Sequence, residues 1–296
     1  MNGCSTVKLA AAAHEAGIFP SLVPITHKAY DKQTLPGFLD SQTDLWGLLQ
    51  EYYKLTGSKN LLLQCSPGIW YNGDAVKILI DWQPSHLYIM KPDPFYTSDE
   101  EQNLDFINSD DIKRDVYKVL QHTKFITSIK LNACQKIASY DAYTVLGNSK
   151  AGQCGNLNLE EFVVQQKNLE PDFPIIASGG IYSSAQIKNL LTLGASAVAI
   201  GTMFTTAQES DLSVQAKNKI INSSFADSGR FGPNQNVLQN EIAPSYDPTN
   251  PNGTDKIYQG TFGDLSSGHI PIGPAVDFMQ EIKPLRDIVA LLVEDL

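Results

Sequence analysis

Two short apolar runs, each ending in glycine, constrain the fold of this chain more than any other feature. They are Phe173-Pro-Ile-Ile-Ala-Ser-Gly-Gly-Ile181 and Ala197-Val-Ala-Ile-Gly-Thr-Met-Phe204. A helical pattern from Ser183 to Leu193 separates them. The order strand, glycine turn, helix, strand, glycine turn predicts a parallel βαβ unit.

Both strands of this unit end in glycines, so two backbone loops can bring their N–H groups close to one ligand. Paired loops of this kind form the phosphate site after strands 7 and 8 of many (β/α)8 barrels. The alternative is that the glycines only permit tight turns. We favour the phosphate cradle because two such loops occur on neighbouring strands.

The composition indicates one acidic globular domain. A chain of 296 residues with 42% hydrophobic residues can bury one large core. A net charge of −10 and a pI near 4.9 argue against nucleic acid or an anionic membrane as partner. The sequence has no apolar run of about 20 residues and no basic-then-apolar leader. The four cysteines lack CxxC or zinc spacing, so we expect no metal site and a cytoplasmic location.

Strand and helix patterns alternate along most of the chain, which predicts a parallel sheet with helical crossovers. The expected strands begin near residues 18, 60, 86, 124, 142, 173 and 197. The expected helices cover 6–16, 41–55, 74–82, 112–122, 132–139, 159–168 and 183–193. The predicted fold is therefore an α/β, TIM (β/α)8-type barrel that lacks its first strand.

The βα alternation stops after Phe204. A helix is expected over Thr205 to Asn222, and residues 229–268 are rich in Gly, Pro, Asn, Asp and Ser. Long irregular stretches in compact domains are usually functional or disordered. We predict that residues 1–204 and 270–296 form the barrel, closed by a helix from Pro284, and that residues 205–269 form a helix and a loop-rich excursion covering the barrel mouth.

A barrel without its first strand would expose two strand edges. A gene fragment, a degenerate paralogue and a dimer that donates the strand all account for the pattern. The last explanation would make the protein a homo-oligomer.

Four segments resemble the nitronate monooxygenase (2-nitropropane dioxygenase) family. The opening Met1-Asn-Gly-Cys-Ser-Thr-Val-Lys-Leu-Ala-Ala-Ala-Ala-His-Glu-Ala-Gly17 is similar to the family's Met-x-Gly-x-Ser-Thr-x-x-Leu-Ala. The two glycine-ended strands resemble its flavin-phosphate strands. The segment Asp141-Ala-Tyr-Thr-Val-Leu-Gly-Asn-Ser-Lys-Ala-Gly152 resembles its Asp-Ala-x-x-x-Gln-Gly-x-Glu-Ala-Gly. Flavin-dependent enoyl-acyl-carrier-protein reductases share much of this pattern.

The resemblance implies an FMN-dependent barrel that oxidises alkyl nitronates with O2, which makes a small molecule and O2 its partners. Carried over by position, the phosphate would lie on N–H groups near the ends of the two strands, with Gly152 also at the cofactor. Gln64 falls where the family places an asparagine, and the first loop would line the flavin. The implied cofactor residues are Met1, Gly3, Gln64, Gly152, Ser178, Gly179, Gly180, Ile200, Gly201 and Thr202.

The sequence departs from the family at two chemically important positions. Leu146 stands where the family has a glutamine that reaches the flavin. Cys154 stands where its catalytic histidine is expected, and is the candidate catalytic residue here. Among the five histidines, His269 is the one that could reach the barrel mouth.

Three functions therefore stay open at the level of sequence. The first is nitronate oxidation through FMN. The second is a catalytically impaired homologue that binds flavin or another phosphate ligand, supported by the two departures. The third is an NAD(P)H-dependent FMN reductase of the enoyl-acyl-carrier-protein reductase type.

Overall fold

A computed structural model describes residues 6–24, 42–65, 73–89, 120, 122–129, 140–231, 235–238 and 269–296. Met1 and Gly3, two of the expected flavin contacts, lie outside the described residues, as do the expected helix over 132–139 and most of that over 112–122. Among the described helices, none is long and apolar enough to cross a membrane.

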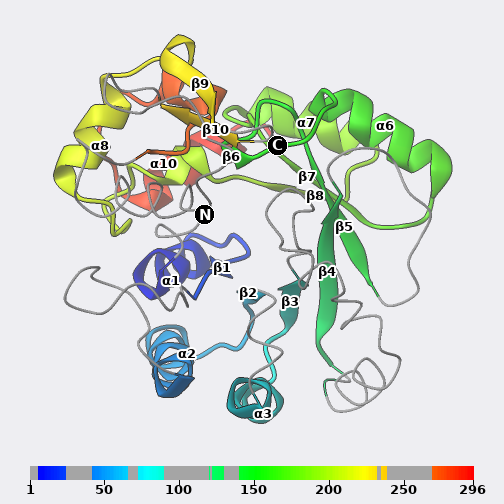
Figure 1. The fold of residues 1–296 in the computed structure, drawn as a ribbon, viewed down its shortest axis with the longest axis vertical. Coiled ribbons are helices and arrows are strands. Elements are labelled where there is room, and N and C mark those ends of the chain that lie inside the picture. The colour runs from blue at the N-terminus through cyan, green and yellow to red at the C-terminus, as the bar shows by residue number, and fades with distance from the viewer. Residues whose placement is uncertain are drawn as a thin grey trace, which may run out of the picture.

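The core of the fold is a seven-stranded parallel sheet that curls like part of a barrel (Figure 1). Its strands are β1 (Ser21–Leu22), β2 (Leu62–Cys65), β3 (His86–Ile89), β4 (Lys124–Ile129), β5 (Ala142–Leu146), β7 (Ile175–Ser178) and β8 (Ala197–Ala199). They pair in the order β1-β2-β3-β4-β5-β7-β8, so β1 and β8 are edges in the part of the chain that is described. The expected TIM-type architecture, one strand short, is confirmed.

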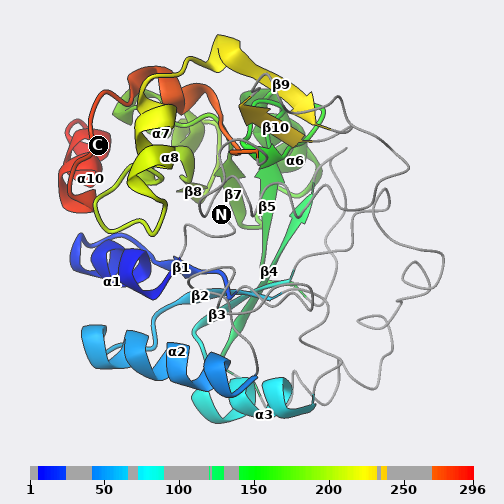
Figure 2. The same cartoon turned by 60° about the vertical axis from the view of Figure 1, so that its left-hand side comes forward.

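Helices follow most of these strands and lie along the outside of the sheet (Figure 1). The α-helices are α1 (Val7–Glu15), α2 (Gln42–Thr56), α3 (Gly73–Trp82), α6 (Leu159–Leu169), α7 (Ser184–Thr192), α8 (Val214–Ile221) and α10 (Leu285–Val293). Short 3-10 helices are η2 (Thr202–Phe204), η3 (Phe225–Asp227) and η4 (Pro274–Phe278). The helix α10 contacts both α1 and α7, so the helical layer continues from the last strand to the first (Figure 2).

The two faces of the sheet differ in chemistry. Alternate residues of a strand point to opposite faces. One face supplies apolar side chains to the main core, among them Leu63, Leu87 and Val145, all fully buried. The other face carries the residues between them, including Gln64, Tyr88 and Ser128. Because helices cover the first face, the second, more polar face is the concave interior of the barrel.

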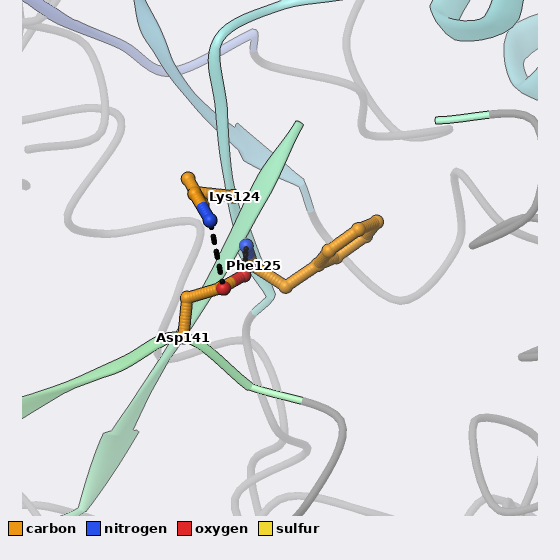
Figure 3. Close-up of polar contacts among 3 residues, drawn as sticks. All are labelled: Lys124, Phe125 and Asp141. Carbon is orange, nitrogen blue, oxygen red and sulfur yellow. Dashed lines mark hydrogen bonds and ion pairs between the residues drawn. The ribbon is translucent and has the colours of Figure 1, made fainter. Parts of the chain in front are cut away.

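Strands β4 and β5 are joined at their amino ends by Asp141 (Figure 3). Its carboxylate accepts a hydrogen bond from the backbone N–H of Phe125 at 2.8 Å and pairs with the Lys124 ammonium at 3.3 Å. This places the contact at the end of the sheet opposite to the glycine loops. The contact ties the start of β5 to the start of β4 and so fixes their register. A shift by one residue would move every side chain of the strand to the opposite face of the sheet.

The segment after β8 differs from the sequence-based expectation in two places. The expected helix over Thr205 to Asn222 is confined to α8, because Ser213 caps its start by accepting a hydrogen bond from Ala216 N at 3.1 Å. Residues 229–268 were expected to be irregular, yet they begin within an antiparallel hairpin of β9 (Ser228–Phe231) and β10 (Gln235–Leu238). The rest of that stretch, residues 239–268, lies outside the described residues.

Candidate functional site

Two loops at the carboxyl ends of β7 and β8 form an open set of backbone donors. Gly179 and Gly180 have φ angles of +126° and +70°, which favour glycine. The N–H groups of Gly179, Gly180, Gly201 and Thr202 donate no hydrogen bond to any described residue. Since β7 and β8 are neighbours with Ser178 opposite Ala199, the two loops leave the sheet side by side. This set of donors at Gly179, Gly180, Gly201 and Thr202, called the cradle below, can hold an anion.

A threonine hydroxyl accompanies these donors. Thr202 as a whole residue is 8% exposed, and its hydroxyl makes no hydrogen bond to another described residue. An anion bound between the loops would satisfy the Thr202 hydroxyl together with the backbone donors.

The loop after β5 packs directly onto the glycines of the cradle. A Cβ placed on Gly179 would lie 2.7 Å from Lys150 Cβ, and one on Gly180 would lie 2.8 Å from Ser149 Oγ. Gly179 is therefore required both by backbone conformation and by its close approach to the Lys150 backbone, and Gly180 chiefly by its conformation. Tight packing, the alternative considered from the sequence, thus accounts for part of the glycine pattern, while a bound phosphate would account for the vacant N–H donors.

Asn236 in β10 holds this loop in place. Its side-chain amide donates hydrogen bonds to Asn148 O at 3.0 Å and to Lys150 O at 2.8 Å. Asn236 is buried, and it also forms a parallel bridge with Ala151, just before the short strand β6 (Gly152–Gln153). The hairpin that interrupts the expected irregular stretch therefore supports the loop beside the cradle.

The segment that leads into the last helix also reaches the cradle. A Cβ on Gly273 would lie 3.1 Å from Ser149 O and 3.5 Å from Thr202 Oγ1. Pro274 lies within 3.5 Å of the Cβ position of Gly180. Three stretches distant in sequence, around Ser149, Gly180 and Gly273, thus meet at one place.

A row of polar side chains lies on the concave face of the sheet. Gln64 of β2 lies in register with Tyr88 of β3, and the Tyr88 hydroxyl is hydrogen-bonded to Ser128 of β4. Burial raises the pKa of Tyr88 to about 12, and the hydrogen bond with Ser128 acts in the opposite direction. Tyr88 is therefore a neutral hydroxyl over the physiological pH range.

The residues at the family's glutamine and histidine positions are both buried. Leu146 ends β5 next to Ser178 of β7 and is 3% exposed. Cys154, just after β6, forms no disulfide and is fully buried. His269 is also buried, in the stretch that packs against β10 through a hydrogen bond from Leu238 N to Ile270 O. A substrate can therefore reach the Cys154 thiol only if the residues that bury it move aside.

The structure brings most of the expected cofactor residues together. Those at the cradle are Ser178, Gly179, Gly180, Ile200, Gly201 and Thr202. Gly152 lies in β6, where its Cβ position is 3.7 Å from Pro271. Gln64 lies on a different part of the sheet, separated from β7 by β3, β4 and β5. Sequence reasoning missed Ser149, Lys150 and Asn236, because only the folded chain brings them against the glycines. It also missed Tyr88, although alternation along β3 could have identified its face.

A sequence model of one protein family matches the chain over residues 108–295, more than half of its length. The description of that family is nitronate monooxygenase. The chain belongs to the nitronate monooxygenase family. It is therefore, in kind, a flavin-dependent oxidoreductase, and the cradle offers the donors that a flavin phosphate would need. A search of curated protein sequences finds no significant match.

Several solved structures share the fold of this chain. FabK from Thermotoga maritima has a TM-score of 0.74 at 21% identity, over 99% of this chain and 89% of that chain. Nitroalkane oxidase from Streptomyces ansochromogenes has a TM-score of 0.72 at 17% identity, over 99% and 93%. The enoyl reductase domain of MlnA from Bacillus amyloliquefaciens has a TM-score of 0.65 at 11% identity, over 99% and 91%. These likenesses concern the fold.

Proposed function

We propose that this protein binds FMN with its phosphate in the cradle and oxidises alkyl nitronates with O2. The observation that carries the proposal is the set of four backbone N–H groups and the Thr202 hydroxyl, which have no partner among the described residues. Such donors suit a phosphate dianion, and the family is that of nitronate monooxygenases. A bound FMN would supply electron acceptance, which no side chain offers.

The residues of the concave face would orient the substrate. A nitronate carries its negative charge on the oxygens of the nitro group. The Tyr88 hydroxyl remains protonated because burial raises its pKa, so it can donate a hydrogen bond to such an oxygen. Gln64 lies beside Tyr88 and has an amide that can donate as well. We assign these two side chains to substrate binding.

The choice of a nitronate also fits the loss of the family's histidine. A nitronate is already deprotonated at carbon, so its oxidation needs no general base. The lack of an accessible base at position 154, where a fully buried cysteine replaces the family's histidine, would therefore not prevent turnover. We keep Cys154 as the catalytic candidate only for substrates that must first lose a proton.

The excursion would shield the site from water. We propose that residues 205–269 cover the barrel mouth, because Asn236 within them is bonded to the loop beside the cradle. The buried Cys154, which forms no disulfide, suits a reducing compartment, and we propose the cytoplasm.

Two other functions have specific support. Leu146 and Cys154 replace the family's glutamine and histidine, which favours a homologue that binds flavin or another phosphate ligand without turnover. The likeness of the fold to an enoyl reductase domain favours an NAD(P)H-dependent reductase.

Anaerobic reduction separates these functions. The FMN-loaded protein is mixed without oxygen with an alkyl nitronate, and separately with NADH and NADPH, while flavin absorbance is recorded. We expect bleaching by the nitronate and recovery of the absorbance when O2 is admitted. Bleaching only by a reduced nicotinamide would replace the proposal with the reductase. No bleaching by any of them would leave flavin binding without turnover.

A further inference from the structure

The cradle has a third side, made by the loop after β5. Lys150 Cβ lies 2.7 Å from the Cβ position of Gly179, and Ser149 Oγ lies 2.8 Å from that of Gly180. Ser149 also meets the Cβ position of Gly273 through its carbonyl oxygen, at 3.1 Å. The same Gly273 position is 3.5 Å from Thr202 Oγ1. The Ser149–Lys150 pair therefore borders both phosphate loops.

The side chains of this pair have the right chemistry for an anion. The Ser149 hydroxyl makes no hydrogen bond to another described residue, like that of Thr202. The Lys150 ammonium folds back along the loop, 3.1 Å from Ala151 O, and Lys150 is half-buried. The positive charge of Lys150 thus stays on the loop that packs against the cradle.

A local positive charge matters in this chain. The net charge is −10, so the overall field opposes the approach of an anion. Backbone N–H groups offer only partial charges, whereas an ammonium supplies a full one. Hydrogen bonds between ionised partners are about twice as strong as neutral ones.

The position of the pair is set by contacts outside the cradle. Asn236 bonds to two carbonyls of the loop, at 3.0 Å to Asn148 O and 2.8 Å to Lys150 O. The side chains of Ser149 and Lys150 are thus presented from a backbone that is fixed at both ends. An anion-binding arm built in this way loses little entropy when it binds.

We propose that Ser149 and Lys150 form the third side of the phosphate site, with Ser149 as a hydroxyl donor and Lys150 as the counter-charge. The site would then distinguish a phosphorylated flavin from the same ring system without phosphate. This inference rests on the proposed binding of FMN. It adds two ligand residues that the glycine loops alone do not provide.

Titration with two flavins tests the pair. The full-length apoprotein is titrated with FMN and with riboflavin, by quenching of flavin fluorescence, for wild type and for Lys150→Gln, Lys150→Arg and Ser149→Ala. Lys188→Gln is the matched control, since Lys188 is an exposed residue of α7 and the substitution changes the net charge equally. Thermal unfolding of each apoprotein checks that the variants fold.

We expect Lys150→Gln to weaken FMN binding about tenfold, the loss of one charge-assisted bond, without changing riboflavin binding. Lys150→Arg should retain most of the affinity, Ser149→Ala should lose about threefold to tenfold, and Lys188→Gln should match wild type.

The results that overturn the inference are distinct from those that overturn FMN binding. Equal FMN affinities of wild type and a folded Lys150→Gln would exclude the third side while leaving FMN in the cradle. An equal loss for FMN and riboflavin would assign Lys150 a general structural role and reject the inference. If wild type binds neither flavin, both the inference and the proposed function fail.

Discussion

The Ser149 hydroxyl oxygen lies 2.8 Å from the point where a side chain on Gly180 would begin. The two residues are separated by two strands and a helix in the sequence, yet a methyl group on Gly180 would displace the Ser149 hydroxyl. Gly180 also has a φ angle of +70°, which side chains rarely adopt. The cradle is thus fixed by the packing of the β5 loop as well as by its own glycines.

This relationship predicts that Gly180→Ala damages the site beyond its backbone strain. Gly57→Ala is a matched control, because Gly57 has a φ of +65° and nothing within 4 Å of its Cβ position. Each substitution should cost about 1–2 kcal/mol of unfolding free energy from conformation alone. Gly180→Ala should cost little more than this in unfolding free energy, measured by urea denaturation, because the Ser149 hydroxyl can rotate away. The displaced hydroxyl should nevertheless weaken FMN binding. A folded Gly180→Ala that binds FMN as tightly as wild type would contradict the prediction.

Asn236 should matter to the site although it lies in the hairpin. Asn236→Asp keeps the shape but replaces the donating amide with an acceptor facing two carbonyl oxygens. The expected loss is at least about 1–3 kcal/mol of stability, together with weaker FMN binding. Denaturation and flavin titration measure the two effects. Asn222→Asp serves as the control, since Asn222 is an exposed helix-cap residue whose amide donates to one carbonyl, that of Asn218. A variant at 236 that binds FMN as wild type does would contradict the supporting role.

Tyr88 should make stability fall at alkaline pH. The ordinary pKa of a tyrosine is 10.0 and that of Tyr88 in the fold is about 12, so the unfolded chain loses the proton first. The stabilisation is complete below pH 10 and is lost as pH rises through 12, by about 3 kcal/mol at most. Burial also raises the pKa of Tyr52 and Tyr140, which adds to the same trend.

The Tyr88→Phe variant isolates this contribution. Urea midpoints are measured between pH 8 and 11.5 for both proteins. We expect a shallower decline for the variant above pH 10, with the other tyrosines unchanged. Parallel curves would mean that Tyr88 ionises as readily in the fold as in the unfolded chain.

At the opposite end of the sheet, the two partners of Asp141 should differ in importance. Asp141→Ala removes the acceptor for Phe125 N and should cost about 1–2 kcal/mol. Lys124→Gln removes only an exposed ion pair and should cost less than about 0.5 kcal/mol. Denaturation in low and in high salt measures both. A larger loss for Lys124→Gln would reverse the assignment.

Local sequence patterns were sufficient to predict all seven strands of the sheet. Runs such as Ile175–Ser178 are short, β-branched and flanked by turn residues, so their type does not depend on distant partners. The helices α6 and α7 were predicted for a similar reason, since Asn158 and Ser183 cap them by accepting hydrogen bonds from the first turn.

The rest of the site depended on distant contacts. Nothing near Asn236 indicates that it bonds to the loop at Lys150, 86 residues away in sequence. The hairpin of β9 and β10 has no alternation of apolar and polar residues that would reveal it. Such elements form because the fold supplies partners, which periodicity cannot show. The glycine loops were predictable; the residues that pack onto them were not.

Flavin uptake by the purified protein is the most direct measurement. Apoprotein is titrated with FMN, freed of excess ligand by gel filtration, and scanned in the visible range, with Gly180→Ala in parallel. The account predicts stoichiometric FMN on the wild-type protein, with the absorption bands of oxidised flavin, and much less on the variant. A colourless wild-type protein that takes up no FMN would contradict it.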